Sequence, residues 1–573
     1  MRKYIVGLLL CFLFLNFCHF SLFAQSVNSE RQVVLRKWQD CKFGMFIHWG
    51  LYSVPGGVWK GQNIPYYAEQ IMNHARIDTA EYAKIAAQFE APDWNADEIV
   101  RLAKDAGMKY IVFTAKHHDG FCMFRTRTTP YNVVEATPFA RDPIQELAAA
   151  CKKYNLQLGL YYSLPDWHYA GGIPRNPVDT LTNCSQHINQ LYSPLERITP
   201  ELENYIDAQL QELLTQYGDL VTLWFDMGLA TPEQSSRFRQ TVLRYQPNCL
   251  INGRLMNNQG DYYTLTDNSQ MVGFSDIPWD NPASMYGTWG YRSWENRGEF
   301  HIKALLQIER LINTVSHGGV FLLNIGPNGD GKVIDFEKDV LQEMGQWIAQ
   351  NQESIYATTA CPFPNLKNVY CTQKDNKIYF FVRQSDTLIE CRNLITKVQK
   401  AYFLYAKNKV NVTPIDQGCA LRFVAPVGEG WHVLVLEFAE NAIVQPYYLL
   451  PEKNSFALTP DNGLTHAAFD GMGYVSLQND SWKEWNLSIQ KAGKYKVWIE
   501  YYPMFISKNY LFSFGNQTVK AILPGVDDVL QTAFVGTFEL KEGKTTFQLQ
   551  SASPCDALEP LGLWIKRVVV VGE

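Results

Sequence analysis

The feature that most constrains the fold is an alternation of strand-like and helix-like patterns between Lys42 and about Asn351. Short apolar runs typical of fully buried strands are Phe43–Trp49, Tyr110–Thr114, Leu156–Tyr162, Leu220–Asp226, Cys249–Asn252 and Val320–Ile325. Segments with helical spacing of apolar residues lie between them: Asp97–Ala106, Ile144–Tyr154, Leu202–Gln216 and His301–Val315. Repeated strand–helix units over roughly 300 residues predict an α/β catalytic domain built as a (β/α)8-type barrel. A doubly wound open sheet is the structural alternative, but no GxGxxG motif follows the early strands.

The chain of 573 residues is too long for one hydrophobic core. We place the barrel domain at residues 25–354, because short strand-like segments separated by turns replace the alternation beyond it. Residues 355–440 are predicted to form a β-sandwich, and residues 441–573 a second β-rich domain. A structural sandwich and a carbohydrate-binding domain are the two interpretations of the second.

The N-terminus has the pattern of a secretory signal peptide at residues 1–24. Arg2 and Lys3 precede an apolar run from Ile5 to Phe17, and a small residue, Ala24, ends the segment. That run is too short for a durable membrane span, so we expect an exported protein, periplasmic or extracellular. The net charge of −6 and the lack of a basic cluster argue against a nucleic-acid partner.

Polar and aromatic residues stand at the C-terminal ends of the predicted strands, where barrels of this type carry their functional groups. They are His48, His117, His118, Tyr161, Tyr162, Trp224, Asp226 and Arg254. A carboxylate such as Asp226 at the end of an apolar strand is costly to bury without a purpose. Converging hydrogen-bonding groups and aromatic rings indicate a pocket for a small polyol.

The same residues raise the alternative of a metal site formed by His48, His117, His118 and Asp226. No HExxH or comparable local spacing supports that alternative. Adjacent His117 and His118 point to opposite faces if the chain there is extended. The cysteines are scattered without a CxxC pair. We therefore expect neither a metal nor a cofactor.

Hydrolysis of a glycosidic bond needs two carboxyl groups, one as nucleophile or base and one as acid. Asp226 is the first candidate. The aspartates that follow Arg254 and precede the next predicted strand are Asp261, Asp267, Asp276 and Asp280. Asp267 lies in a polar loop that can close over the mouth of a barrel, and Asp280 is its competitor.

Eight stretches of the chain resemble the α-L-fucosidases of glycoside hydrolase family 29. In order they are FGMFIHWGLYSVPGG (Phe43–Gly57), YYAEQIM (Tyr66–Met72), KHHDGF (Lys116–Phe121), GLYYS (Gly159–Ser163), LWFDMG (Leu223–Gly228), INGR (Ile251–Arg254), GTWGY (Gly287–Tyr291) and LLNIGPNGDG (Leu322–Gly331). They occur in family order across the whole barrel region.

The resemblance implies an enzyme that removes terminal α-L-fucosyl residues from glycans through a covalent glycosyl-enzyme, with Asp226 as nucleophile. It implies that the fucose hydroxyl groups are bound by His48, Glu69, His117 and His118, with Tyr161 or Tyr162, Trp224 and Arg254 beside them. Trp289 looks like the wall against the C5 methyl group. A fucosylated oligosaccharide or glycoconjugate is the implied substrate.

Three departures from the family pattern bear on linkage preference. Asp267 stands in the loop where the family often has a glutamate, and we choose Asp267 as acid/base. Gln70 replaces a common tryptophan, and Asp280, also counted as a substrate contact, replaces a frequent glutamate. Two alternatives stay open: a catalytically silent fucose-binding protein, and a retaining glycosidase for a related sugar such as a galactoside.

Overall fold

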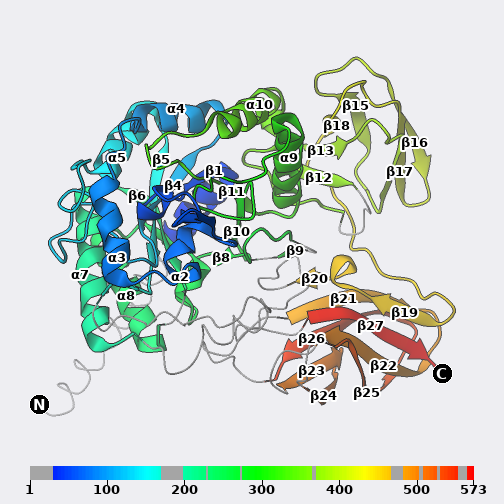
Figure 1. Ribbon diagram of the computed structural model, residues 1–573. Helices are drawn as coiled ribbons and strands as arrows, with labels where there is room; N and C mark the ends of the chain where they lie inside the picture. The colour runs from blue at the N-terminus through cyan, green and yellow to red at the C-terminus, as the bar shows by residue number, and fades with distance from the viewer. Residues whose placement is uncertain are drawn as a thin grey trace, which may run out of the picture.

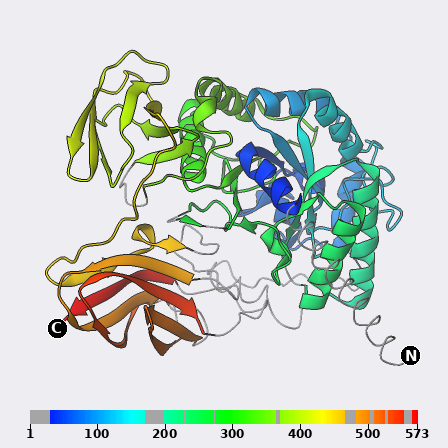
Figure 2. The ribbon, with the colours of Figure 1, turned by 180° about the vertical axis from the view of Figure 1, so that it is seen from behind.

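The computed structural model describes residues 30–169, 198–227, 230–271, 274–275, 277–363, 369–465, 482–502, 508–524, 529–552 and 564–573. The predicted signal peptide lies outside these residues, as does Asp276. A barrel and two β-sandwiches make up the described part. In Figure 1 and Figure 2 both sandwiches lie to one side of the barrel, one above the other.

Eight parallel strands form the barrel sheet. They are β1 (Phe43–Ile47), β4 (Tyr110–Lys116), β5 (Gln157–Ser163), β6 (Leu220–Asp226), β7 (Leu250–Ile251), β8 (Tyr263–Thr264), β10 (Trp279–Ser284) and β11 (Val320–Ile325). Their order is β7-β6-β5-β4-β1-β11-β10-β8, and every pairing is parallel. A parallel bridge between Asn252 and Tyr262 joins the two outer strands and closes the barrel. The predicted barrel is confirmed, and the open-sheet alternative is wrong.

Helices surround this sheet (Figure 1). They are α2 (Ile71–His74), α3 (Thr79–Ala83), α4 (Ala96–Asp105), α5 (Pro143–Tyr154), α7 (Pro200–Gln216), α8 (Pro232–Tyr245), α9 (Phe300–Ser316) and α10 (Asp335–Asn351). Short 3-10 turns occur at Leu51–Ser53, Ala68–Gln70, Lys84–Gln88, Gly253–Leu255 and Gln352–Ser354, and a small hairpin joins β2 (Val58–Trp59) and β3 (Gln62–Asn63). Local capping interactions determine where helices begin. At the start of α8, Thr231 and Gln234 form a capping box, and Pro232 occupies the first helical position.

Two barrel strands, β8 and β10, escaped the sequence prediction. β8 has only two residues, and β10 reads WDNPAS, which lacks the apolar run of a buried strand. Among the described residues no α-helix separates β7 from β8 or β8 from β10. The barrel is therefore irregular in the part of the chain that contains Asp267 and Asp280.

Alternation along the strands divides the buried residues into two sets. Phe46, Val112, Tyr161, Trp224 and Leu322 pack together inside the barrel. Their neighbours pack outside, beneath the helices: Ile47, Phe113, Tyr162, Phe225 and Leu323. Successive residues of a strand point to opposite faces, so the residue two positions beyond each inner residue also points inward. That rule places His48, Asp226 and Asn324 in one layer at the C-terminal end of the barrel.

The first sandwich follows the barrel in the chain. Its sheets are β12 (Tyr370–Lys374), β13 (Lys377–Val382), β18 (His432–Phe438) and β15 (Val398–Phe403) in one, and β14 (Leu388–Arg392), β17 (Gly418–Phe423) and β16 (Val410–Ile415) in the other. Ile378, Phe380, Leu434 and Leu436 fill its core. The alternate residues Tyr379, Phe381, Val433 and Val435 belong to the barrel's outer core. One face of this sheet therefore packs on the barrel.

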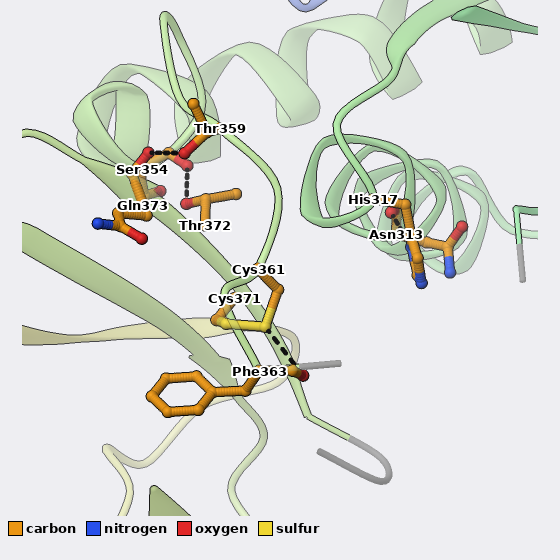
Figure 3. Close-up of a disulfide and its surroundings, with 9 residues drawn as sticks. All are labelled: Asn313, His317, Ser354, Thr359, Cys361, Phe363, Cys371, Thr372 and Gln373. Atoms are coloured by element: carbon orange, nitrogen blue, oxygen red, sulfur yellow. Dashed lines mark hydrogen bonds between the residues drawn. A yellow bond between two sulfur atoms is a disulfide. The ribbon is translucent and has the colours of Figure 1, made fainter. Parts of the chain in front are cut away.

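A disulfide between Cys361 and Cys371 lies where the chain enters the first sandwich (Figure 3). The backbone N–H of Cys361 donates to the carbonyl of Ser316 at the end of α9, at 2.8 Å. The disulfide and this hydrogen bond together link β12 to the barrel. The sequence alone left the pairing of cysteines open.

The second sandwich has a four-stranded and a six-stranded sheet. The first contains β19 (Ser455–Leu458), β27 (Trp564–Gly572), β22 (Gly493–Tyr502) and β25 (Gln531–Leu540). The second runs in the order β24 (Gln517–Leu523), β23 (Lys508–Phe514), β26 (Gly543–Ser551), β21 (Trp482–Ile489), β20 (Leu464–Thr465) and β9 (Phe274–Ser275). A 3-10 turn, Pro460–Asn462, precedes β20. The last strand of the six-stranded sheet, β9, lies in the chain between the barrel strands β8 and β10.

Among the described residues, no helix is long and apolar enough to span a membrane.

Candidate active site

Asp226 is the last residue of β6 and occupies the inner face two positions beyond Trp224. Tyr161 donates a hydrogen bond to its Oδ2 at 2.7 Å, and Arg254 donates to its Oδ1 at 2.8 Å. Burial alone raises the pKa of this carboxyl group, but the positive charge of Arg254 and these two hydrogen bonds outweigh burial and hold the pKa below its ordinary value. Asp226 is therefore an ionised, oriented carboxylate.

The two tyrosines of the GLYYS stretch separate across the strand. Tyr161 points into the barrel and reaches Asp226. Tyr162 points outward and donates to Gln209 of α7 at 2.6 Å, in the outer core. Tyr161 therefore faces the site. Tyr162 faces away from it, contrary to the expectation that it contacts the sugar, because neighbours in a strand face opposite sides.

His118 is fully buried beside Asp226, with its Nε2 3.8 Å from Asp226 Oδ2. Its Nδ1 lies 2.6 Å from the hydroxyl oxygen of Ser163, which itself donates to the carbonyl of Pro165. Because that hydroxyl has only one hydrogen, it must accept from Nδ1–H of His118. Burial lowers the pKa of His118 to about 4. The neutral ring therefore presents an Nε2 lone pair to the site.

His48 is oriented in the same way by Asn324. The amide nitrogen of Asn324 donates to the carbonyl of Trp289 at 2.7 Å, so its Oδ1 accepts from Nδ1 of His48, also at 2.7 Å. Burial lowers the pKa of His48 to about 4. Because Nδ1 of His48 carries the hydrogen, Nε2 is fixed as a second acceptor in the site. The ring of Trp289 lies 5.2 Å from the imidazole, centroid to centroid.

His117 completes a continuous group of rings. Its centroid lies 4.1 Å from that of His118, 5.7 Å from His48 and 5.6 Å from Tyr161. β4 ends at Lys116, so the chain is no longer extended at His117 and His118 and both rings belong to the same group. The buried Nδ1 of His117 has no hydrogen-bond partner among the described residues. A buried nitrogen without a partner is a position for a ligand's hydroxyl group.

Glu69 is hydrogen-bonded to the loop that carries Trp289. Its Oε2 accepts from the backbone N–H groups of Trp289 and Gly290, at 3.0 and 2.8 Å, and from the hydroxyl group of Thr288 at 3.0 Å. Burial raises the pKa of Glu69. These three donors fix the carboxyl group and, in return, the backbone of the Trp289 loop.

Arg254 joins the two candidate catalytic acids. One terminal nitrogen donates to Asp226, and the other donates to Asp267 and to the carbonyl of Leu265. The guanidinium lies over the ring of Trp224, 4.8 Å from its centroid. Because one planar group binds both carboxyl groups, Asp226 and Asp267 lie within the width of a single side chain.

Asp280 lies deeper in the barrel. It pairs with Val320, the first residue of β11, whereas the mouth is formed by the last residues of the strands. It accepts a hydrogen bond from Trp224 Nε1 at 2.9 Å, and burial raises its pKa to about 7. Asp280 is thus placed beneath Trp224, and the expectations that it contacts the sugar or competes with Asp267 at the mouth are wrong. Trp224 likewise supports Arg254 from below.

Residues whose role the sequence did not reveal hold the predicted ones in place. They are Ser163, Thr288 and Asn324. Inward-facing polar residues at the ends of apolar strands are a usable signal, and both Ser163 and Asn324 carry it. Within the described residues no group of three or more His, Cys, Asp and Glu side chains is arranged to hold a metal ion.

Comparison with known proteins agrees with this geometry. The family model described as Alpha-L-fucosidase matches residues 19–353. The tissue alpha-L-fucosidase of Mus musculus is 31% identical over 375 residues, which cover 62% of this chain and 78% of the mouse protein. The plasma alpha-L-fucosidase of Homo sapiens is 31% identical over 352 residues, covering 56% and 70% respectively.

A solved structure extends the likeness to the sandwiches. The alpha-L-fucosidase from Vibrio sp. strain EJY3 superposes with a TM-score of 0.66 at 26% identity, covering 94% of this chain and 98% of that one. The family match spans more than half of the chain, and the barrel is the fold that the sequence predicted. The chain belongs to the α-L-fucosidase family of glycoside hydrolases.

Proposed function

We propose that this α-L-fucosidase is an exo-acting, retaining enzyme in which Asp226 is the nucleophile and Asp267 the acid/base. The observation that supports this most is the bridging of both carboxyl groups by the guanidinium of Arg254. Retaining glycosidases need carboxyl groups only about 5–5.5 Å apart, and one guanidinium spans such a distance. A solved fucosidase with 24% identity, from Bacteroides thetaiotaomicron, is described as a trapped covalent intermediate.

In the first step Asp226 attacks the anomeric carbon of the fucosyl residue. The bond to the leaving oxygen breaks, and Asp267 gives that oxygen its proton. In the second step Asp267 takes a proton from water, and the resulting nucleophile releases fucose from Asp226. The lowered pKa of Asp226 suits the first step, since an ionised carboxylate attacks.

Asp267 must turn during this cycle. Arg254 only donates hydrogen bonds, so in the present arrangement Asp267 is an acceptor. A general acid has to donate to the leaving oxygen. Asp267 is 32% exposed and lies on a loop, whereas Asp226 ends a barrel strand, so Asp267 is the carboxyl group that is free to turn.

The group of rings supplies the sugar site. His48 and His118 offer lone pairs to fucose hydroxyl groups, His117 offers its unpartnered nitrogen, and Trp289 faces the C5 methyl group. The hydrogen bond from Tyr161 orients Asp226, and the hydrogen bond from the N–H of Gly290 to Glu69 holds the Trp289 loop in place. A terminal fucose of a glycan fits this enclosed group, and the rest of the glycan lies towards Asp267.

The experiment that tests this assignment is chemical rescue of an Asp226→Gly variant. The variant should not hydrolyse an aryl α-L-fucoside, and added azide should restore release of the aryl group with formation of β-L-fucosyl azide. The inverted azide product identifies the residue that occupied the β face. Ordinary activity without azide, or an α-azide product, contradicts the role of Asp226.

Export to the periplasm or the exterior is part of the proposal and rests on residues 1–24 alone. N-terminal sequencing of the mature protein should begin at Gln25. Recovery of a cell-associated protein that retains Met1 would contradict export.

A further inference from the structure

The loop that carries Asp267 is built partly from the second sandwich. After β8 the chain passes Leu265 and Asp267 and then forms β9. β9 pairs in parallel with β20, with Phe274 opposite Leu464 and Ser275 opposite Thr465. β9 is therefore the edge strand of the six-stranded sandwich sheet, and Figure 1 shows it between the barrel and the sandwich.

Side chains extend this connection on both sides of Asp267. Leu265, two residues before it, and Met271, four residues after it, are 0% and 1% exposed. Both belong to the hydrophobic cluster of the second sandwich rather than to either barrel cluster. The cluster also contains Trp279 of β10 and Trp485 of β21. The sandwich core thus continues into the loop.

The barrel strand β10 holds the same loop through hydrogen bonds at Leu265 and Asn268. The backbone N–H of Leu265 donates to the carbonyl of Asp280 at 3.0 Å. Asn268 donates its N–H to the carbonyl of Pro282 at 3.1 Å and accepts at Oδ1 from the N–H of Ser284 at 2.8 Å. Its φ of 58° lies in the left-handed region, which asparagine tolerates better than most residues. Asp267 is therefore held between hydrogen bonds to the barrel, made by Leu265 and Asn268, and packing of the Leu265 and Met271 side chains in the sandwich cluster.

We infer that the second sandwich is a positioning element for the acid/base, acting through Leu265, Met271 and the β9–β20 pairing. This inference rests on the proposed role of Asp267. When Asp267 releases Arg254 to meet the leaving oxygen, the loop must stay in place while the side chain turns. Displacement of a catalytic group by about 1 Å can cost on the order of 100-fold in rate.

The test compares two substrates that differ in their need for acid catalysis. A fucoside with a very good leaving group needs little protonation, whereas a natural fucosyl oligosaccharide needs it fully. The reference variant, Asp267→Ala, should lose much more kcat on the oligosaccharide. The test variant, Met271→Ala, should show the same selective loss at about 10-fold, with the aryl fucoside within about twofold of wild type.

The matched control is Leu523→Ala in β24, at the opposite edge of the same sheet and in the same hydrophobic cluster. It removes a similar volume from the sandwich core and should lower stability without selective loss on the oligosaccharide. Equal losses on both substrates in Met271→Ala, or selective loss in Leu523→Ala, would overturn the inference. If Met271→Ala does not fold, Leu265→Val makes the same test with a smaller effect.

Failure of the underlying function is recognised separately. If Asp267→Ala itself shows no dependence on the leaving group, Asp267 is not the acid/base and the proposed function is wrong at that residue. If Asp267→Ala shows the dependence and neither loop variant does, the acid/base stands and the positioning role of the sandwich is wrong.

Discussion

The two sandwiches meet the barrel in different ways, and the difference separates support from positioning. The first packs one sheet face against the outer core of the barrel, and its Trp431 carbonyl accepts a hydrogen bond from Trp347 of α10 at 2.8 Å. The second takes a strand, β9, from a loop of the active site into its own sheet. A domain's effect on catalysis therefore depends on which barrel segment it holds.

The largest loss of activity is expected from a substitution of Asp226, and the effects of substitutions in the two sandwiches are compared with it. Asp226 ends a barrel strand and its side chain contacts the barrel residues Tyr161, Arg254 and His118, so Asp226→Asn should abolish its role as a nucleophile while the fold persists. We expect kcat on every fucoside to fall by at least about 10³-fold. Steady-state kinetics with an aryl fucoside and a thermal unfolding curve make the check. A variant that keeps a tenth of the activity would contradict the assignment.

A substitution in the first sandwich should act on stability alone. Trp431 is buried against the barrel, and the guanidinium of Arg383 lies 4.4 Å from its ring centroid. Trp431→Ala removes this packing and should destabilise the protein by about 3–5 kcal/mol. Denaturant unfolding measures the loss.

The kinetic outcome of Trp431→Ala decides whether the two sandwiches really differ. The folded fraction should keep wild-type kcat on both the aryl fucoside and the oligosaccharide, because the backbone carbonyl that contacts Trp347 is retained. A selective loss on the oligosaccharide would show that the first sandwich also positions the acid/base, and the comparison would fail.

The sequence predicted the half of the site that stands on strands. Apolar runs such as Leu220–Asp226 indicate buried strands. Because side chains alternate between the two faces of a strand, Asp226 is assigned to the barrel interior with Trp224. The same period distinguishes Tyr161 from Tyr162 once the inner face is known. These features are local, so a single sequence contains them.

The loop-borne half could not be predicted in the same way. β8 and β9 are two residues long, and β10 carries Asp280 and Pro282 where an apolar run is expected. The partner of β9 lies about 190 residues further along the chain, and only tertiary packing brings it there. The mistaken choice of Asp280 as a substrate contact has this origin, because its depth in the barrel depends on its register with Val320.

Asp280 allows a test of how stability depends on pH where the barrel meets the second sandwich. It follows Trp279, which belongs to the hydrophobic cluster of that sandwich. The folded pKa of Asp280 is raised to about 7. Between the ordinary carboxyl value near 4 and this value, the unfolded chain loses a proton that the folded protein keeps, so the stability of wild type falls as pH rises. Asp280→Asn lacks this loss, and its stability relative to wild type should increase from pH 4 to 7, by up to about 1.4 kcal/mol per unit. Denaturant unfolding at several pH values measures it; a constant difference would contradict the buried, protonated carboxyl group.

The smallest expected effect is at the contact of the first sandwich. His301 of α9 lies between Glu343 of α10, at 2.5 Å, and Glu429 before β18, at 2.9 Å. Hydrogen bonds that the protonated ring donates to the carboxylates of Glu429 and Glu343 raise its pKa, although the side chain is exposed. A raised folded pKa gives stability that is present below the unfolded value near 6.5 and is lost as pH rises through the folded value. His301→Ala should therefore lower Tm slightly at pH 5.5 and less at pH 8.5, while Glu429→Gln should remove part of the same difference. This contact joins the barrel helices to the first sandwich, which we expect to affect stability alone. For both variants, kcat and the dependence of rate on the leaving group should therefore stay at wild-type values at both pH values. A change in either quantity would show that the first sandwich also positions the acid/base.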